Sequence, residues 1–237
     1  MRHLALARSL TDRTYDAILD AISGGELPAG TRINQDELAA RLNVSRQPVV
    51  QALALLKVQG FVRESGRRGV VVAPLDANFI SHLYELRSAL DGAACRGAAQ
   101  RGSKEARLWG PALIAEGRAA FASGSVKRMV DADMRFHRLL YDLCGNPMIA
   151  ETAALHWHHI RRLIDGYLQH YPMRDVWDEH QAILDAVISG DPNRAEAAAR
   201  RHADGAAARF TALVVASAPT ESESSGKPAG KRRRTRS

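Results

Sequence analysis

Residues 35–59 read QDELAARLNVSRQPVVQALALLKVQ and contain two short stretches of helical periodicity, separated by Asn43-Val44. Ser45, at the start of the second stretch, is a typical N-cap residue. The apolar positions that should face inward recur every three or four residues: Leu38, Ala39, Leu42, Val49, Ala52, Leu53 and Leu56. Two helices joined by so short a turn predict a helix-turn-helix.

The flanking residues extend this unit on both sides. A helical pattern over about residues 10–23 ends at Gly24-Gly25, and Gly60 ends the helix that begins after Ser45. Residues 61–64 (FVRE) and 70–73 (VVVA) then predict two strands around the basic, glycine-flanked segment 65–69. We therefore expect a β hairpin, or wing, after the helix-turn-helix.

The rest of the chain divides into a long helical region and a tail. Residues 76–216 carry apolar stripes interrupted by glycine- and proline-containing breaks, which predicts a bundle of about six helices. Residues 217–237 are rich in Ser, Gly, Lys and Arg, and we expect them to be disordered. The predicted fold is mainly α: a winged helix-turn-helix domain over residues 1–75, an all-α bundle over 76–216 and a basic tail.

Composition narrows the class of protein. The 237 residues carry a net charge of +7 and have no apolar run long enough to span a bilayer. Cys95 and Cys144 lack the spacing of a thiolate metal site. We expect a reduced, cytoplasmic protein without a membrane partner. The tail is either an arm that binds DNA phosphates or a solvated segment that aids solubility.

The helix after Ser45 has the polar start that a DNA-reading helix needs. Arg46 suits guanine or phosphate and Gln47 suits adenine, whereas the apolar stripe points inward. In the wing, Arg67 and Arg68, next to Gly69, would contact the DNA backbone or minor groove. The alternative is a helical hairpin with ordinary surface charges.

Three segments, 28–33 (PAGTRI), 37–49 (ELAARLNVSRQPV) and 55–62 (LLKVQGFV), closely resemble the winged helix-turn-helix of GntR-type transcriptional regulators. The family usually has Arg then Glu after the Pro-Val pair, and this chain has Val50 and Gln51. This departure argues against a standard family operator. Val50 either contacts a thymine methyl group or is simply an exposed apolar residue.

Four polar residues of the helical region lie on apolar stripes and should point into the bundle. Asp133 and His137 are four residues apart on one helix, and His180 and His202 lie on two others. One carboxylate and three imidazoles would suit a divalent transition metal such as Zn or Ni. The alternative is a set of hydrogen-bonded core histidines.

Residues 133–137 (DMRFH), Glu179-His180 and Arg201-His202 resemble the pattern of the FCD effector-binding domain of FadR-type GntR regulators. The resemblance implies that Asp133 and the three histidines bind a metal whose open positions accept water or a carboxylate effector. It extends to 84–91 (YELRSALD), where Arg87 becomes a candidate carboxylate clamp. The alternatives for Arg87 are an ion pair with Asp91 and a solvated charge. Arg161 is the second effector-binding candidate.

The resulting prediction is a transcriptional regulator that binds a palindromic operator as a homodimer. The resemblance implies a repressor, because repression is the commoner behaviour in the family. A small carboxylate metabolite at the metal site would control its affinity for DNA. Two alternatives stay open: a metal-responsive regulator whose effector is the cation, and a metal-dependent hydrolase. Four protein ligands and no accompanying acid/base motif argue against the hydrolase.

Overall fold

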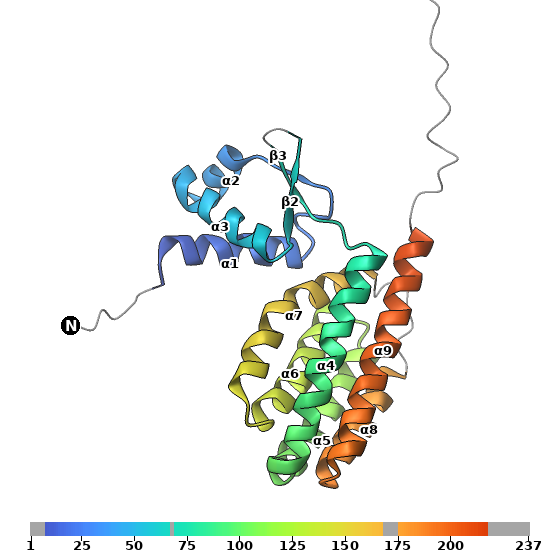
Figure 1. Cartoon of the computed structure of the whole chain (residues 1–237). Helices are drawn as coiled ribbons and strands as arrows, with labels where there is room; N and C mark the ends of the chain where they lie inside the picture. The colour runs from blue at the N-terminus through green and yellow to red at the C-terminus, as the bar shows by residue number, and fades with distance from the viewer. Residues whose placement is uncertain (1–7, 67–68, 168–174, 218–237) are drawn as a thin grey trace, which may run out of the picture.

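The computed structural model describes residues 8–66, 69–167 and 175–217, and it has a small winged part followed by a helical bundle (Figure 1). The winged part comprises α1 (Leu10–Ser23), β1 (Arg32–Ile33), α2 (Gln35–Leu42), α3 (Arg46–Val58), β2 (Val62–Ser65) and β3 (Gly69–Val72). Arg67, Arg68 and residues 218–237 of the predicted tail lie outside the described residues, and Ser217, predicted as the first tail residue, is the last residue of a helix. The predicted helix-turn-helix is therefore present as α2 and α3.

Local side-chain chemistry sets where these helices begin and end. Ser9 and Asp12 form a reciprocal capping box at the start of α1, and the Asn34 side chain accepts hydrogen bonds from the first turn of α2. Asn43 takes the left-handed conformation (φ 53°) that ends α2. Ser45 occupies the N-cap position of α3, but its side chain makes no capping hydrogen bond.

The wing, formed by β2 and β3, belongs to a three-stranded antiparallel sheet of order β1-β3-β2, in which β3 is central. Val62 pairs with Val72 and Ser65 with Gly69, as expected for a hairpin. β1 pairs with β3 on its other side and was not predicted, because two residues are too few to show a period-2 pattern.

Six helices follow in the described part of the chain, in agreement with the predicted number. They are α4 (Ala77–Arg101), α5 (Ser103–Ala122), α6 (Val126–Leu143), α7 (Pro147–Tyr167), α8 (Val176–Ile188) and α9 (Pro192–Ser217). The long helices α4 and α9 lie side by side and antiparallel (Figure 1). Among the described residues, no helix is long and apolar enough to cross a membrane.

Small residues let the bundle helices approach closely. Ala94 and Ala98 of α4, and Ala195 and Ala199 of α9, are almost completely buried. This leaves the larger polar side chains of α4, α6, α8 and α9 facing one another inside the bundle. The predicted fold class, a winged helix-turn-helix plus an all-α bundle, is confirmed.

Helix α7 carries most of the contact between the bundle and the winged part. The His159 ring stacks on Phe61 with centroids 3.7 Å apart, and its Nε2 lies 2.9 Å from the Gln59 carbonyl oxygen. Arg162 Nη2 donates to the carbonyl oxygen of Ala73 at 2.7 Å. An aromatic stack and these two polar contacts are thus among the contacts that join the two parts.

Candidate functional site

The four predicted metal ligands come together inside the bundle. Asp133 and His137 project from α6, His180 from α8 and His202 from α9, and all four residues are buried. One nitrogen from each histidine lies within 4.8 Å of the other two. Asp133 Oδ1 is 3.4 Å from His180 Nε2 and 4.0 Å from His137 Nε2. Helical spacing predicted that each of these residues points inward, and the packing of α6, α8 and α9 brings them to one point.

The protonation of the site suits a cation. Burial, reinforced by nearby positive charge, lowers the pKa of His137 and His180 well below 6.5, so both rings are neutral near pH 7 and retain a lone pair. Burial raises the pKa of Asp133, and the charge of Arg87 opposes that effect. Neutral imidazoles beside a carboxylate are the donor set of many divalent transition-metal sites.

The pair His180 and His202 offers a test of this fit. Their Nε2 atoms face each other at 3.3 Å, while His180 Nδ1 is buried without a hydrogen-bond partner among the described residues. A proton on His180 Nε2 would satisfy the pair as core histidines. A cation shared by the two lone pairs would instead leave the proton on Nδ1. The four residues therefore fit a metal ion. If they are hydrogen-bonded core residues instead, His180 carries its proton on Nε2 and donates it to His202.

Glu179 fixes the orientation of His202. Its Oε2 lies 2.7 Å from His202 Nδ1, and both of its oxygens accept hydrogen bonds from Arg209 at 2.8 and 3.0 Å. Burial alone would raise the pKa of Glu179, but these hydrogen bonds outweigh it and lower the pKa to about 2. Glu179 is therefore a carboxylate that accepts from His202 Nδ1 and leaves Nε2 facing the site.

Arg87 lies beside the histidines on α4, buried rather than solvated. Its Nε donates to Asp91 at 3.1 Å, and its Nη2 lies 2.8 Å from His137 Nε2. Tyr141 donates to the other oxygen of Asp91, and the guanidinium lies 5.1 Å from the Trp157 ring centroid. The predicted ion pair with Asp91 is present, and because Arg87 also lies at the site, it stays a candidate for binding a carboxylate.

A very small cavity adjoins these groups. Its volume is about 20 Å³, and Arg87, Asp133 and His202 are among its lining residues. A volume of this size holds about one water molecule. In this conformation the site accommodates an ion or a water, and a metabolite requires the helices to move apart.

The structure does not bring Arg161 to this site. Its guanidinium lies 3.5 Å from Asp20 of α1 and 3.6 Å from Asp165, on the outside of α7. The neighbouring Arg162 is buried in α7, whereas Arg161 is about one-third exposed. Arg161 contacts the winged part instead of the inner cavity.

The predicted DNA-binding residues at the start of α3 are exposed, whereas Gly69 in the wing is buried. Arg46, Gln47 and Val50 are exposed at the start of α3, as is Ser45. Arg46 is held by Gln35 Oε1 at 3.2 Å and by Asp36 at 3.5 Å. Gly69 is buried in β3, where an added Cβ would lie 2.4 Å from the Ser65 carbonyl oxygen. Gly69 therefore shapes the hairpin by letting the strands approach closely.

Sequence reasoning missed three polar residues of the inner site: Glu179, Arg209 and Tyr141. Arg209 is seven residues after His202, two helical turns along the same face, so the spacing did contain a signal. Glu179 precedes His180 and points to a different helix, which no single-helix pattern reveals.

Comparisons with known proteins agree with this arrangement. The family described as "FCD domain" matches residues 82–205, and "Bacterial regulatory proteins, gntR family" matches residues 10–72. The Nta operon transcriptional regulator of Aminobacter aminovorans is 36% identical over 125 residues, 52% of this chain and 59% of that protein. The HTH-type transcriptional repressor NanR of Klebsiella aerogenes is 29% identical over 90% of each chain.

The fold also matches a solved structure, that of E. coli McbR/YncC, with a TM-score of 0.72 and 17% identity over 86% of this chain and 98% of that one. Both matched families and the named relatives are transcriptional regulators, which excludes the hydrolase alternative. The chain belongs to the GntR family of bacterial regulatory proteins, as a DNA-binding transcriptional regulator whose second part is an FCD domain.

Proposed function

We propose that this regulator is a metal-containing repressor that binds a palindromic operator as a homodimer and changes its DNA affinity when a small carboxylate metabolite binds near the metal. The observation that carries the proposal is the convergence of three buried imidazoles and a carboxylate beside the buried guanidinium of Arg87. Repression is supported by the relative named as a repressor, NanR.

The DNA-binding face is supported by exposure and chemistry at the start of α3. Arg46 and Gln47 are exposed there, next to the exposed side chain of Val50. Their donors and acceptors match base edges in the major groove. Arg67 and Arg68 stand in the sequence between Gly66 and Gly69 of the wing and would add phosphate contacts. A dimer would place two such faces on two half-sites.

The metal would be held by Asp133, His137, His180 and His202, and zinc or nickel suits this donor set. When bound, it would supply a Lewis acid that accepts a ligand carboxylate oxygen. Glu179 would hold His202 in the tautomer that leaves Nε2 unprotonated.

Arg87 supports a carboxylate as the ligand. Its planar fork matches two carboxylate oxygens. The lone pair of His137 Nε2 cannot both accept from Arg87 and coordinate a cation. An occupied site therefore leaves Arg87 Nη2 without that acceptor, and a carboxylate would replace it.

The second candidate is a regulator that responds to the cation alone. The cavity of about 20 Å³ favours it, because an ion fits without any movement of the helices. In that case metal binding itself would change operator affinity. The metabolite proposal instead treats the metal as a resident part of the bundle.

A thermal-shift screen of metal-quantified protein separates the two candidates. The protein is heated with small organic acids and sugar acids, with and without added zinc or nickel, and any hit is added to an operator-binding titration. Stabilisation that needs both metal and acid, with a change in operator affinity, supports the metabolite. A change caused by metal alone supports the cation.

The ligand assignment is tested by His202→Ala, with His82→Ala, an exposed histidine of α4, as the matched control. We expect the first variant to lose bound metal and melt earlier, and the control to retain both properties. A His202 variant with unchanged metal content contradicts the assignment. Light scattering of the same samples tests the homodimer.

A further inference from the structure

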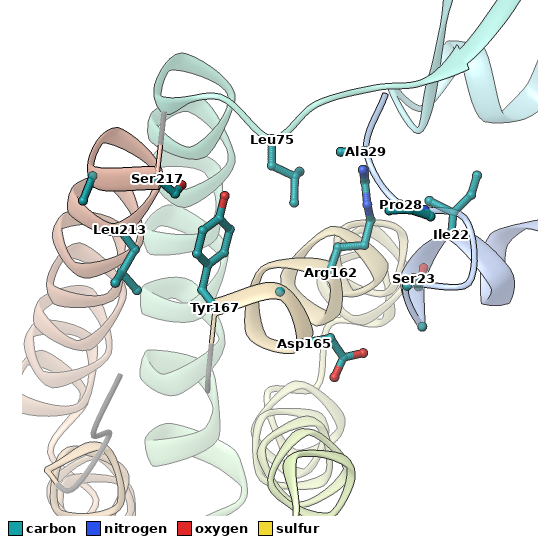
Figure 2. Close-up of a pocket in the computed structure, with 14 residues that line it drawn as sticks. Ile22, Ser23, Pro28, Ala29, Leu75, Arg162, Asp165, Tyr167, Leu213 and Ser217 are labelled. Atoms are coloured by element: carbon teal, nitrogen blue, oxygen red, sulfur yellow. The ribbon is translucent and has the colours of Figure 1, made fainter. Parts of the chain in front are cut away.

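A second and much larger cavity lies between the winged part and the bundle (Figure 2). Its volume is about 590 Å³. The walls come from the end of α1 and the loop after it, from Leu75 in the connection to α4, and from the ends of α7 and α9. Cavities of 300–1,000 Å³ are the usual size for small-molecule sites.

Arg162 is the buried cationic side chain in the wall of this cavity, and its charge favours an anionic ligand. The residue is only 7% exposed, and Figure 2 shows its side chain rising from α7 between Leu75 and Pro28. Its Nη2 donates to the Ala73 carbonyl oxygen, and its Nη1 is buried with no hydrogen-bond partner among the described residues. One amino group of the guanidinium thus has a hydrogen-bond partner and the other has none, while the group as a whole lies 5.9 Å from the Phe61 ring centroid.

No carboxylate among the described residues forms an ion pair with Arg162. Asp165, on the same cavity wall, lies 3.6 Å from Arg161 instead. Burial lowers the pKa of Arg162 to about 10, so the group is still charged at pH 7. A buried charge without an opposite charge is costly, and an anion in the cavity would compensate it.

We propose that this interdomain cavity binds a small organic anion with an apolar body, whose carboxylate pairs with Arg162. The lining residues also include several apolar side chains: Ile22, Pro28, Ala29, Leu75, Leu213 and Ala216. They match an aromatic or aliphatic body better than a sugar. The site is separate from the inner cavity, because within the described part of the chain the two cavities have only Leu213 in common as a lining residue.

Binding here would couple to DNA recognition through the contact between the two parts. Ile22 and Pro28 belong to the winged part, whereas Arg162 and Leu213 belong to the bundle. A ligand that touches both sides stabilises the arrangement in which they meet, and so changes how freely the winged part adapts to an operator.

The test uses 1-naphthoate and its neutral analogue 1-naphthamide as probes of the full-length protein by isothermal titration calorimetry. Because a hydrogen bond to a charged group contributes about 1.5–3 kcal/mol, the acid should bind at least about tenfold more tightly than the amide. Arg162→Gln should abolish this preference. Arg201→Gln, which removes an exposed positive charge of α9 outside the lining residues, is the matched control and should retain it.

Cavity filling locates the probe. Ala216→Trp places a large side chain on the cavity wall, whereas Ala212→Trp, also exposed on α9, lies outside the lining residues. The first variant should weaken naphthoate binding at least about tenfold and the second should not. Binding should also persist after chelation has removed all metal.

Three results would overturn the proposal: no naphthoate binding to a folded wild-type protein, equal affinity for acid and amide, or an unchanged acid preference in Arg162→Gln. Loss of binding on chelation would instead assign the probe to the inner site. Circular dichroism of each variant checks that the fold is retained.

Discussion

Glu179 shows how much of the inner site depends on one side chain outside the ligand set. Its carboxylate joins His202 Nδ1 to Arg209, so it fixes both the tautomer and the orientation of a proposed ligand. A helix pattern marks Glu179 only as a charged neighbour of His180. Its role depends on the residue of α9 that faces it.

We expect Glu179→Gln to weaken metal binding by about 10–100-fold, because an amide no longer enforces an Nδ1 proton on His202. A competition titration with a chelating metal indicator measures this. Asp178→Asn is the control, since Asp178 pairs with the exposed Arg118 and not with the site. Equal metal affinity in the Glu179 variant and the wild type would show that His202 needs no such partner.

Arg87 and Arg161 illustrate the limit of inference from a single residue. Both are arginines on bundle helices with an Asp four residues along. Arg87 is buried against Asp91 and His137, whereas Arg161 is about one-third exposed and contacts Asp20. The difference is set by which helix lies opposite, and not by the residue type or its neighbours in sequence.

At the scale of elements, the packing of α5 against α8 depends on a glycine. A Cβ added at Gly117 would lie 2.0 Å from the ring of Trp177. Trp177 is 5% exposed in the core that also contains Ile183 and Leu184. The two helices can meet at this distance only if one of them has no side chain there.

Gly117→Ala should therefore destabilise the protein by about 1–3 kcal/mol, because the tryptophan must shift. Gly166→Ala in α7 is the control, since nothing lies within 4 Å of its added Cβ, and alanine should be neutral or slightly stabilising there. Urea unfolding of the two variants measures the difference. A Gly117 variant as stable as the wild type would mean that the Trp177 contact is loose.

The start of α3 is the element on which operator recognition is proposed to depend. Arg46→Ala should weaken specific operator binding by at least about 1 kcal/mol, because Arg46 is the exposed cation closest to the helix N-terminus. Lys57→Ala, at the far end of α3 and paired with Glu64, is the control. Titrations at one salt concentration measure both, and an unchanged Arg46 variant would remove this residue from the reading face.

At the scale of the whole molecule, His159 makes the contact between the winged part and the bundle sensitive to acid. Burial is the main cause that lowers its pKa to about 4, below the unfolded value of about 6.5. Between these values the unfolded chain binds a proton that the folded protein does not. The stability due to neutral His159 is therefore complete above pH 6.5 and is lost as the pH falls toward 4.

His159→Gln should reduce the pH dependence of unfolding free energy between pH 6.5 and 4.5, by up to about 1.4 kcal/mol per pH unit. Urea unfolding of metal-free protein across this range measures the slope. His82→Gln, an exposed histidine, should leave it unchanged. A His159 variant with the wild-type slope would mean that this ring titrates normally.

The sequence by itself determined the secondary structure apart from β1, the winged helix-turn-helix, and the direction in which Asp133, His137, His180 and His202 point. Helical periodicity and capping residues are local, so they can be read along the chain. Strand β1 was not predicted, because its two residues are recognisable as a strand only by their pairing with β3.

Only the tertiary structure decided which side chains meet. It brought Arg87 into contact with His137, and Glu179 into contact with His202. It left Arg161 away from the inner site and placed Arg162 in the wall of the cavity between the two parts. The physical reason is that periodicity fixes the face of a helix on which a residue lies, whereas its partner depends on the packing of helices that are distant in sequence.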